Sequence, residues 1–257
     1  MTRWLAILIM ISVPLARAGN RANELTLAGI TEFTAAYQAW DGARFAAAAE
    51  LFHQASTNPP PSGTNFYWLG VAQFHRMLQL RSLPDPPPNA SAPGAAMDAA
   101  LAALNQAAKL DARHAETHAL LGTLYGMKIE GNLVRAAWYG PRIEKSRKKA
   151  MESGASNPRV QYLLGMCQFH TAKKPAAWRE TLKTLLAAEK LFEAEAKVTG
   201  GPLEPRWGHS SCLTFIGRTY ELLGESTKAV EYFRKALAMH PADHLAKEGL
   251  KRVTEKK

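Results

Sequence analysis

A glycine within a segment of otherwise helix-favouring residues most restricts the fold of this chain, because the same arrangement occurs four times. Each glycine follows a leucine or isoleucine and precedes an aromatic residue: Gly70 with Phe74, Gly122 with Tyr125, Gly165 with Phe169, and Gly217 with Tyr220. Glycine weakens a helix by about 1 kcal/mol relative to alanine. Its recurrence at one place in a helical motif therefore predicts a point where two helices cross closely.

A second pattern, small then bulky then small, marks the helices expected to pack on these glycines. It reads Ala48, Phe52, Ala55; Ala100, Leu104, Ala107; Thr181, Leu185, Ala188; and Ala229, Phe233, Ala236. The hydrophobic content of 47% is enough for a continuous core, and clustered alanines favour helix. Because no run alternates as a strand would, the sequence predicts an all-α chain.

The clearest helix pair runs from Ser210 to Asp243 and resembles the tetratricopeptide (TPR) repeat over its 34-residue length. The residues that carry the resemblance are Leu213, Ile216, Gly217, Tyr220, Ala229, Phe233, Ala236 and Pro241. The resemblance implies an α-solenoid of about five TPR-like helix pairs over residues 19–257, closed by a C-terminal capping helix over about residues 242–253. It also implies a non-enzymatic adaptor that binds a partner.

The spacing of the repeats departs from the family pattern. The glycines at 70, 122, 165 and 217 are 52, 43 and 52 residues apart, so insertions are expected. Prolines predict an inserted loop over residues 84–94, a second break over residues 131–140 before Pro141 restarts a helix, and a lengthened helix after Pro175 that ends at residues 200–202. The opening helix, expected over residues 30–40, is predicted to lack the glycine.

Two nine-residue segments, 67–75 and 162–170, closely resemble each other at an offset of 95 residues, which also relates Gly122 to Gly217. This suggests duplication of a two-repeat unit. Chance compensation between insertions of different length is the alternative.

The first eighteen residues predict a signal peptide. Arg3 is followed by an apolar run over residues 4–15 and by a small-x-small cleavage site ending at Ala18. We therefore expect a periplasmic or secreted chain after cleavage near Ala18. An uncleaved anchor is the alternative, although the apolar run is shorter than the roughly 20 residues that span a bilayer.

The chain is basic, with a formal net charge of +10 that includes Arg3 and Arg17 of the predicted signal. An exported basic chain meets anionic envelope surfaces, so nucleic acid is an unlikely partner. One cluster on a predicted second helix, Arg142, Lys145, Arg147, Lys148 and Lys149, could supply a peripheral contact with such a surface. The alternative is an ordinary solvated helix face.

The first helices of a TPR solenoid line its concave groove, and helical phase predicts which of their residues face a ligand. The candidates are Tyr67, Phe74, His75, Thr123, Tyr162, Met166, Phe169, His170, Arg218 and Glu221. The aromatic residues suit an apolar peptide surface, and Arg218 suits a carboxylate. The alternative for Phe74 and Phe169 is a place in the core.

No cofactor or metal is expected. His75 and His170 end the two similar segments, but residues two repeats apart are commonly too distant to share an ion. His114 with His118, and His240 with His244, are spaced four apart without a third ligand of recognisable spacing. The two cysteines, Cys167 and Cys212, are either buried free thiols or a single disulfide.

The sequence lacks a phosphate-binding glycine loop, a His-Glu-x-x-His motif and a Gly-x-Ser-x-Gly turn. The run Gly208–Cys212 gathers a possible base and nucleophile but reads better as the start of a helix. The leading hypothesis is an extracytoplasmic adaptor that holds a protein or peptide segment in its groove. The alternatives are a binding protein for a small solute or an anionic envelope polymer, and a part of an oligomeric stalk.

Overall fold

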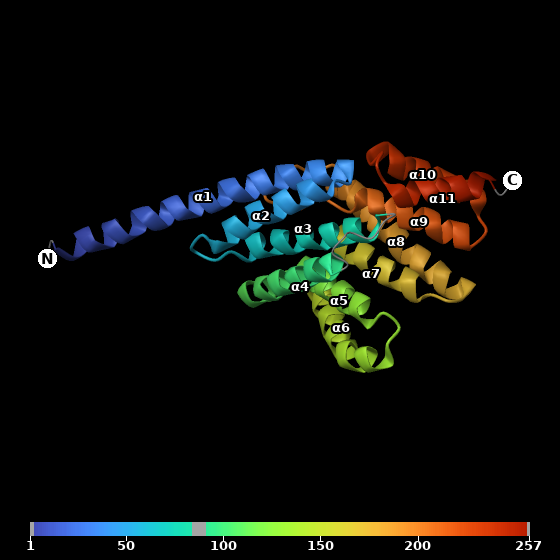
Figure 1. Ribbon diagram of the computed structural model, residues 1–257, viewed down its shortest axis with the longest axis horizontal. Helices are drawn as coiled ribbons and strands as arrows, with labels where there is room; N and C mark the ends of the chain where they lie inside the picture. The colour runs from blue at the N-terminus through green and yellow to red at the C-terminus, as the bar shows by residue number, and fades with distance from the viewer. Residues whose placement is uncertain (1–2, 84–90, 256–257) are drawn as a thin grey trace. The chain divides into compact units, whose positions relative to one another are not determined.

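The computed structural model describes residues 3–83 and 91–255, with side chains described from residue 19 onward. In this part of the chain every regular element is an α-helix, and the eleven helices follow one another as five pairs with a final single helix (Figure 1). The predicted all-α architecture of about five pairs and a capping helix is thus confirmed. The chain divides into two compact units, one formed by Met1–Tyr37 and Asp41–Ala112, the other by Gln38–Trp40 and Arg113–Lys257.

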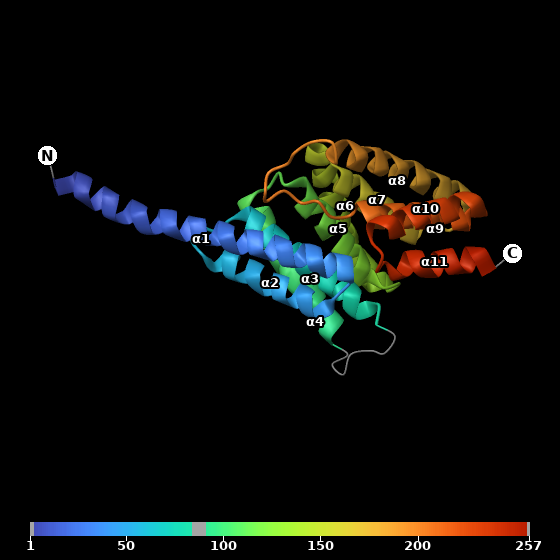
Figure 2. The ribbon, with the colours of Figure 1, turned by 90° about the horizontal axis from the view of Figure 1, so that it is seen from above.

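The first unit holds the first two pairs. These are α1 (Arg3–Ala39) with α2 (Gly42–Thr57), and α3 (Gly63–Arg81) with α4 (Ala92–Leu110); α2 lies along α1 in both ribbon views (Figures 1 and 2). Its core is aromatic. The ring of Phe33 lies 5.8 Å from that of Phe45, 5.6 Å from Trp68 and 5.1 Å from His75, so three helices share one cluster.

The second unit holds three pairs and the capping helix. They are α5 (Ala115–Ile129) with α6 (Leu133–Gly154), α7 (Pro158–Thr171) with α8 (Pro175–Glu195), α9 (His209–Leu222) with α10 (Ser226–Met239), and α11 (His244–Glu255). Local sequence fixes the helix starts. The side chain of Asn132 accepts a hydrogen bond from the backbone N–H of Arg135, and that of Asn157 accepts from Arg159 and Val160. Such caps satisfy backbone donors that a helix start leaves unpaired.

The predicted close crossings are present. A Cβ atom added at Gly70 would lie 2.5 Å from Cγ of Leu104, one at Gly165 would lie 2.5 Å from Cδ2 of Leu185, and one at Gly217 would lie 2.8 Å from Cδ1 of Phe233. The three partners are the bulky residues of the second-helix pattern, and all three are fully buried. In the capping helix, Gly249 packs on Phe233 as well, so one ring is held between two glycines.

Two of these expectations need correction. At Gly122 the nearest atom to an added Cβ would be Cβ of Ser146 at 3.5 Å, an ordinary contact, because α6 carries a small residue where the other second helices carry a bulky one. The opening repeat does possess the glycine. Helix α1 begins far upstream of Ile30, and Gly29 packs on Phe52 with an added Cβ 2.6 Å from Cε1. The signal was present, since Phe33 follows Gly29 by the same four residues that separate Phe74 from Gly70.

The insertions also differ from expectation. Helix α4 begins at Ala92, with Pro93 in its first turn and Gly94 inside it, so the end of the predicted loop at 94 is wrong; residues 84–90 lie outside the described part. A proline is tolerated there because the first helical N–H groups have no intrahelical acceptor. Pro141 lies inside α6, which already begins at Leu133. Helix α8 is long, as predicted, but ends at Glu195, before residues 200–202.

Two of the crossings in the second unit, at Gly165 and Gly122, predict opposite effects of the same substitution. Gly165→Ala should destabilise the unit by about 1–2 kcal/mol, because its methyl group overpacks against the buried Leu185 and the gain in helix propensity offsets only part of this. Gly122→Ala should stabilise it by about 0.5–1 kcal/mol, because the methyl group has room. Urea denaturation of both variants measures the two changes, and equal signs would contradict this account.

Candidate ligand-binding face

Three of the predicted groove residues belong to the core of the first unit. Tyr67, Phe74 and His75 are all buried. The His75 ring contacts the rings of Phe33 and Phe74, and its Nδ1 atom lies 2.9 Å from the carbonyl oxygen of Val71. The expectation that these residues face a ligand is therefore corrected, and for Phe74 the core alternative is the right one.

In the second unit the predicted residues come together along α7 and α9. Phe215 of α9, which the sequence analysis did not single out, lies 5.2 Å from the ring of Phe169 and 5.7 Å from that of His170. The ring of Tyr162 lies 6.2 Å from that of Phe215, and its hydroxyl lies 3.8 Å from Sδ of Met166. Tyr162, Met166 and Phe169 are 6%, 7% and 9% exposed, so most of each side chain lies in the core. For Phe169, as for Phe74, the core alternative agrees with its burial.

Arg218 covers this aromatic strip. The central carbon of its guanidinium group lies 4.7 Å from the ring centre of Phe169 and 5.3 Å from that of Phe215. No described residue forms a hydrogen bond or an ion pair with Arg218, although its side chain is half-buried. Burial and the neighbouring Arg252 lower its pKa, but a guanidinium group remains charged at neutral pH. We call Tyr162, Met166, Phe169, His170, Phe215 and Arg218 the α7–α9 face.

His170 is the titratable neighbour of Arg218 on this face. Burial and, secondarily, the charge of Arg218 lower the pKa of His170. The imidazole is therefore neutral at pH 7, so Arg218 is the only permanent positive charge among the six residues of the face. A partner group that complements it must be an anion in an apolar setting.

The other two candidates are engaged within the protein. The guanidinium group of Arg252 donates two hydrogen bonds to the carboxylate of Glu221, at 2.9 and 3.0 Å. Thr123 is buried, and its hydroxyl donates to the carbonyl oxygen of Ala119 at 3.0 Å. Glu221 therefore borders the α7–α9 face with its charge already paired, and the prediction of Thr123 as a groove residue is corrected.

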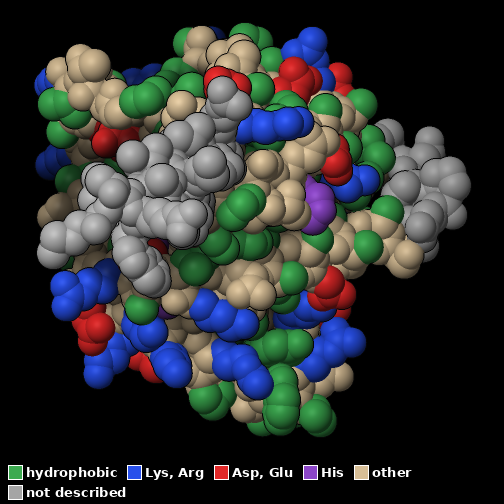
Figure 3. Space-filling model, turned by 90° about the vertical axis from the view of Figure 1, so that its left-hand side faces the viewer, with side chains coloured by type: hydrophobic (Ala, Val, Ile, Leu, Met, Phe, Trp, Pro, Cys, Tyr) green, Lys and Arg blue, Asp and Glu red, His purple; other side chains and the backbone are tan. Residues whose placement is uncertain are grey.

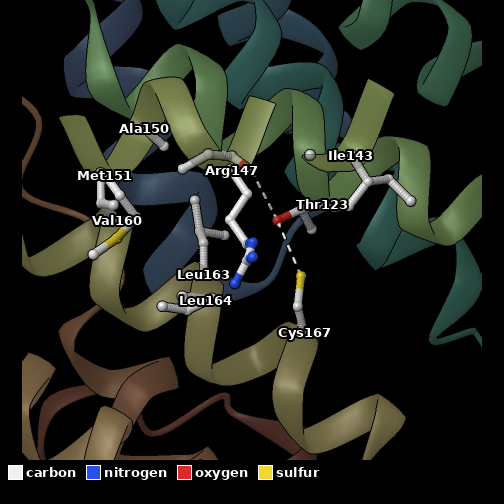
Figure 4. A pocket seen from close by; sticks show the side chains of 11 residues that line it. Thr123, Ile143, Arg147, Ala150, Met151, Val160, Leu163, Leu164 and Cys167 are labelled. Carbon is white, nitrogen blue, oxygen red and sulfur yellow. Dashed lines mark hydrogen bonds between the residues drawn. The ribbon is translucent and has the colours of Figure 1, made fainter. Parts of the chain in front are cut away.

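Thr123 instead lines a small apolar pocket of about 60 Å³ between α5, α6 and α7 (Figure 4). The pocket adjoins Gly122, where Ser146 stands in place of a bulky residue. Its walls are Ala119, Gly122, Thr123, Ile143, Arg147, Ala150, Met151, Val160, Leu163, Leu164 and Cys167. The volume suits a few atoms and is far below the roughly 300 Å³ at which pockets for small molecules begin.

A buried ionic network was not foreseen. The guanidinium group of Arg159 donates to Oε1 of Glu116 at 2.7 Å and to Oε2 of Glu195 at 3.0 Å, and Nδ2 of Asn157 donates to Oε1 of Glu116 at 2.8 Å. The network joins α5, α7 and the end of α8. Its partners are 43 and 36 residues apart in sequence, and no local spacing signals such pairs.

The cysteines are free thiols. Cys212 is fully buried, and Cys167 lies 3.7 Å from the hydroxyl oxygen of Thr123; burial raises the pKa of both thiols. The free-thiol alternative is therefore the right one. Among the described residues there is no group of three or more histidine, cysteine or acidic side chains that could hold a metal ion.

Helix pairs that cross at small residues and end in a capping helix define an α-solenoid of helical repeats. A family model for the tetratricopeptide repeat matches residues 210–243. Among solved structures, the chain resembles a thermophilic TPR protein of Thermus thermophilus, with a TM-score of 0.62 and 15% sequence identity over 91% of this chain and 98% of that one. No curated protein matches the chain.

Residues 210–243 therefore match a tetratricopeptide repeat, and the fold of the whole chain is that of TPR proteins. Such proteins are generally scaffolds that bind protein partners through the surfaces of their stacked helices, and they are generally not enzymes. Within the described residues, no helix has the length and hydropathy of a membrane span.

Proposed function

We propose that the protein is an exported scaffold whose α7–α9 face binds a protein segment carrying a carboxylate beside apolar side chains. The observation that carries the proposal is the guanidinium group of Arg218, held against two aromatic rings without a hydrogen-bonding partner among the described residues. Guanidinium groups bind carboxylates through paired, charge-assisted hydrogen bonds. TPR proteins typically bind protein partners, which supports a protein segment as the ligand of this face.

The contacts of Arg218 with the aromatic rings restrict its side chain before a carboxylate binds. The guanidinium carbon lies within 5.3 Å of the ring centres of both Phe169 and Phe215, so two cation–π contacts hold the group in place. Tyr162 and Met166 continue the apolar surface along α7, one helical turn apart. An extended or helical peptide could therefore place an acidic group on Arg218 and apolar side chains on the adjoining rings.

The pocket beside Gly122 is itself too small for a small solute. It also lies at the α5–α6–α7 junction and includes none of the six residues of the α7–α9 face. A protein segment therefore remains the better match to the geometry.

Selection of peptides from a random display library on the full chain tests the partner class. Enriched peptides should contain Asp, Glu or a free C-terminal carboxylate next to apolar residues. Arg218→Gln should weaken the binding of these peptides by roughly 10- to 100-fold, the worth of hydrogen bonds to a charged group. Fluorescence anisotropy with labelled peptides measures the dissociation constants.

Arg179→Gln is the matched control, because Arg179 is exposed on α8 and the substitution removes the same charge. It should leave the dissociation constant within about twofold of that of the unsubstituted chain. Because a tenfold difference corresponds to roughly 1.4 kcal/mol, this is a change of less than about 0.5 kcal/mol in binding free energy. Peptides that bind Arg218→Gln as tightly as the unsubstituted chain would refute the proposed face.

Export is the second part of the proposal and is supported by the apolar run and the small-x-small site that precede Gly19. Protein recovered from the periplasm or medium of a bacterial host should begin at Gly19, as read by N-terminal sequencing. Changing Ala16 and Ala18 to Lys should block this cleavage, because the processing site accepts small residues. Recovery of an intact chain from the cytosol alone would argue against export.

A further inference from the structure

The first two turns of α6 expose large apolar side chains. Leu133 is 85% exposed, Val134 80% and Trp138 63%. Exposed apolar residues scattered singly are ordinary, but three within six positions of one helix form a patch. In Figure 3, basic side chains lie around hydrophobic ones over the lower part of the surface, at the height of the α5–α6 hairpin in Figure 1.

The local structure holds this patch in a defined helix. Asn132 caps α6 by accepting from the N–H of Arg135 at 3.0 Å, and Arg135 pairs with Glu130 at 2.8 Å. The ring of Tyr139 stacks on that of Tyr125 at 5.8 Å and ties the start of α6 to α5. The apolar side chains are thus presented to solvent by an ordered element.

The patch continues into a basic stripe. At about 100° per residue, Val134, Trp138, Arg142, Lys145 and Lys149 fall within about 80° of one another around α6. The buried residues Ser146, Ala150 and Gly154 lie on a different face. The stripe therefore points away from the contact of α6 with the rest of its unit.

The acidic residues of α6 do not neutralise this stripe. Glu144 pairs with Arg147 at 3.0 Å, and Glu152 lies 3.9 Å from Lys148. No described residue forms an ion pair with Arg142, Lys145 or Lys149. Of these, Arg142 and Lys145 are exposed and Lys149 is half-exposed.

Trp138 and Arg142 form one amphipathic unit. The guanidinium carbon of Arg142 lies 4.5 Å from the centre of the indole ring, and its Nη1 donates to the carbonyl oxygen of Trp138 at 2.8 Å. Tryptophan favours the interface between lipid headgroups and acyl chains, where an adjoining cation can reach phosphates.

From this placement we propose that the α6 stripe, Val134, Trp138, Arg142, Lys145 and Lys149, docks the protein on an anionic lipid bilayer. The aliphatic and indole groups enter the headgroup region while the cations remain at the phosphates. A soluble polyanion would use the cations alone and would leave Val134 and Trp138 in water. Because apolar side chains and cations lie on one face of α6, lipid is the favoured ligand. This proposal does not depend on peptide binding at the α7–α9 face.

A fluorophore at the patch tests this in the full chain. Val134→Cys is labelled with nitrobenzoxadiazole and mixed with vesicles of phosphatidylcholine, with or without phosphatidylglycerol. Its emission should shift to the blue and intensify only with the anionic vesicles. Val198→Cys, labelled equally, is the control, because Val198 is 62% exposed outside α6 and should report no change. Unsubstituted protein, with its two largely buried thiols, gives the labelling background.

Charge variants then separate lipid from simple polyanion binding. Neutralising Arg142, Lys145 and Lys149 to Gln should raise the lipid concentration needed for half the emission change by about 100-fold. Neutralising the same number of cations at Arg179, Lys183 and Lys190 of α8 should change it little. Because the signal is local to position 134, the apolar segment over residues 4–15 does not produce it.

Two outcomes would overturn the proposal. Vesicle binding without a blue shift at position 134 would mean that the cations alone bind the vesicles, in the way that they would bind a soluble polyanion. An emission change that the α8 and α6 charge variants reduce equally would mean that net charge, and not this stripe, is responsible.

Discussion

The close approach of paired helices at single glycines is the constraint on which the rest of the structure depends. At Gly70, Gly165 and Gly217 a buried leucine or phenylalanine of the partner helix fills the space that a side chain would need. Each crossing converts a residue of low helix propensity into a site of dense packing. Repeated along the chain, the contact yields helix pairs, and the pairs yield surfaces on which partners can bind.

In the second unit the glycine crossings differ in how closely the two helices pack. Between α5 and α6, Ser146 stands where the other second helices carry a bulky residue, and Gly122 lines a small pocket there. Around α7 and α9 the contact is tight, and the aromatic residues flanking it extend to the surface beneath Arg218. The start of α6 lies beyond the packed crossing, which leaves Leu133, Val134 and Trp138 exposed.

The sequence predicted the helix pairs well because crossings are encoded by local spacing. It failed where distant segments decide the outcome. Helical phase placed Phe74 and His75 on a groove, but the cluster around Phe33 buries both. The pairing of Arg159 with Glu116 and Glu195 spans three helices and has no local signature. Pro141 predicts a helix start, although capping by Asn132 begins α6 two turns earlier.

A double-mutant cycle on Gly165 and Leu185 tests the central contact most directly. Without the leucine side chain, a methyl group at position 165 has space, so Gly165→Ala should be neutral or stabilising in a Leu185→Ala background while it destabilises the unsubstituted protein. The coupling free energy from urea denaturation should then exceed about 1 kcal/mol. If the two substitutions are additive, the crossing does not organise the fold as argued.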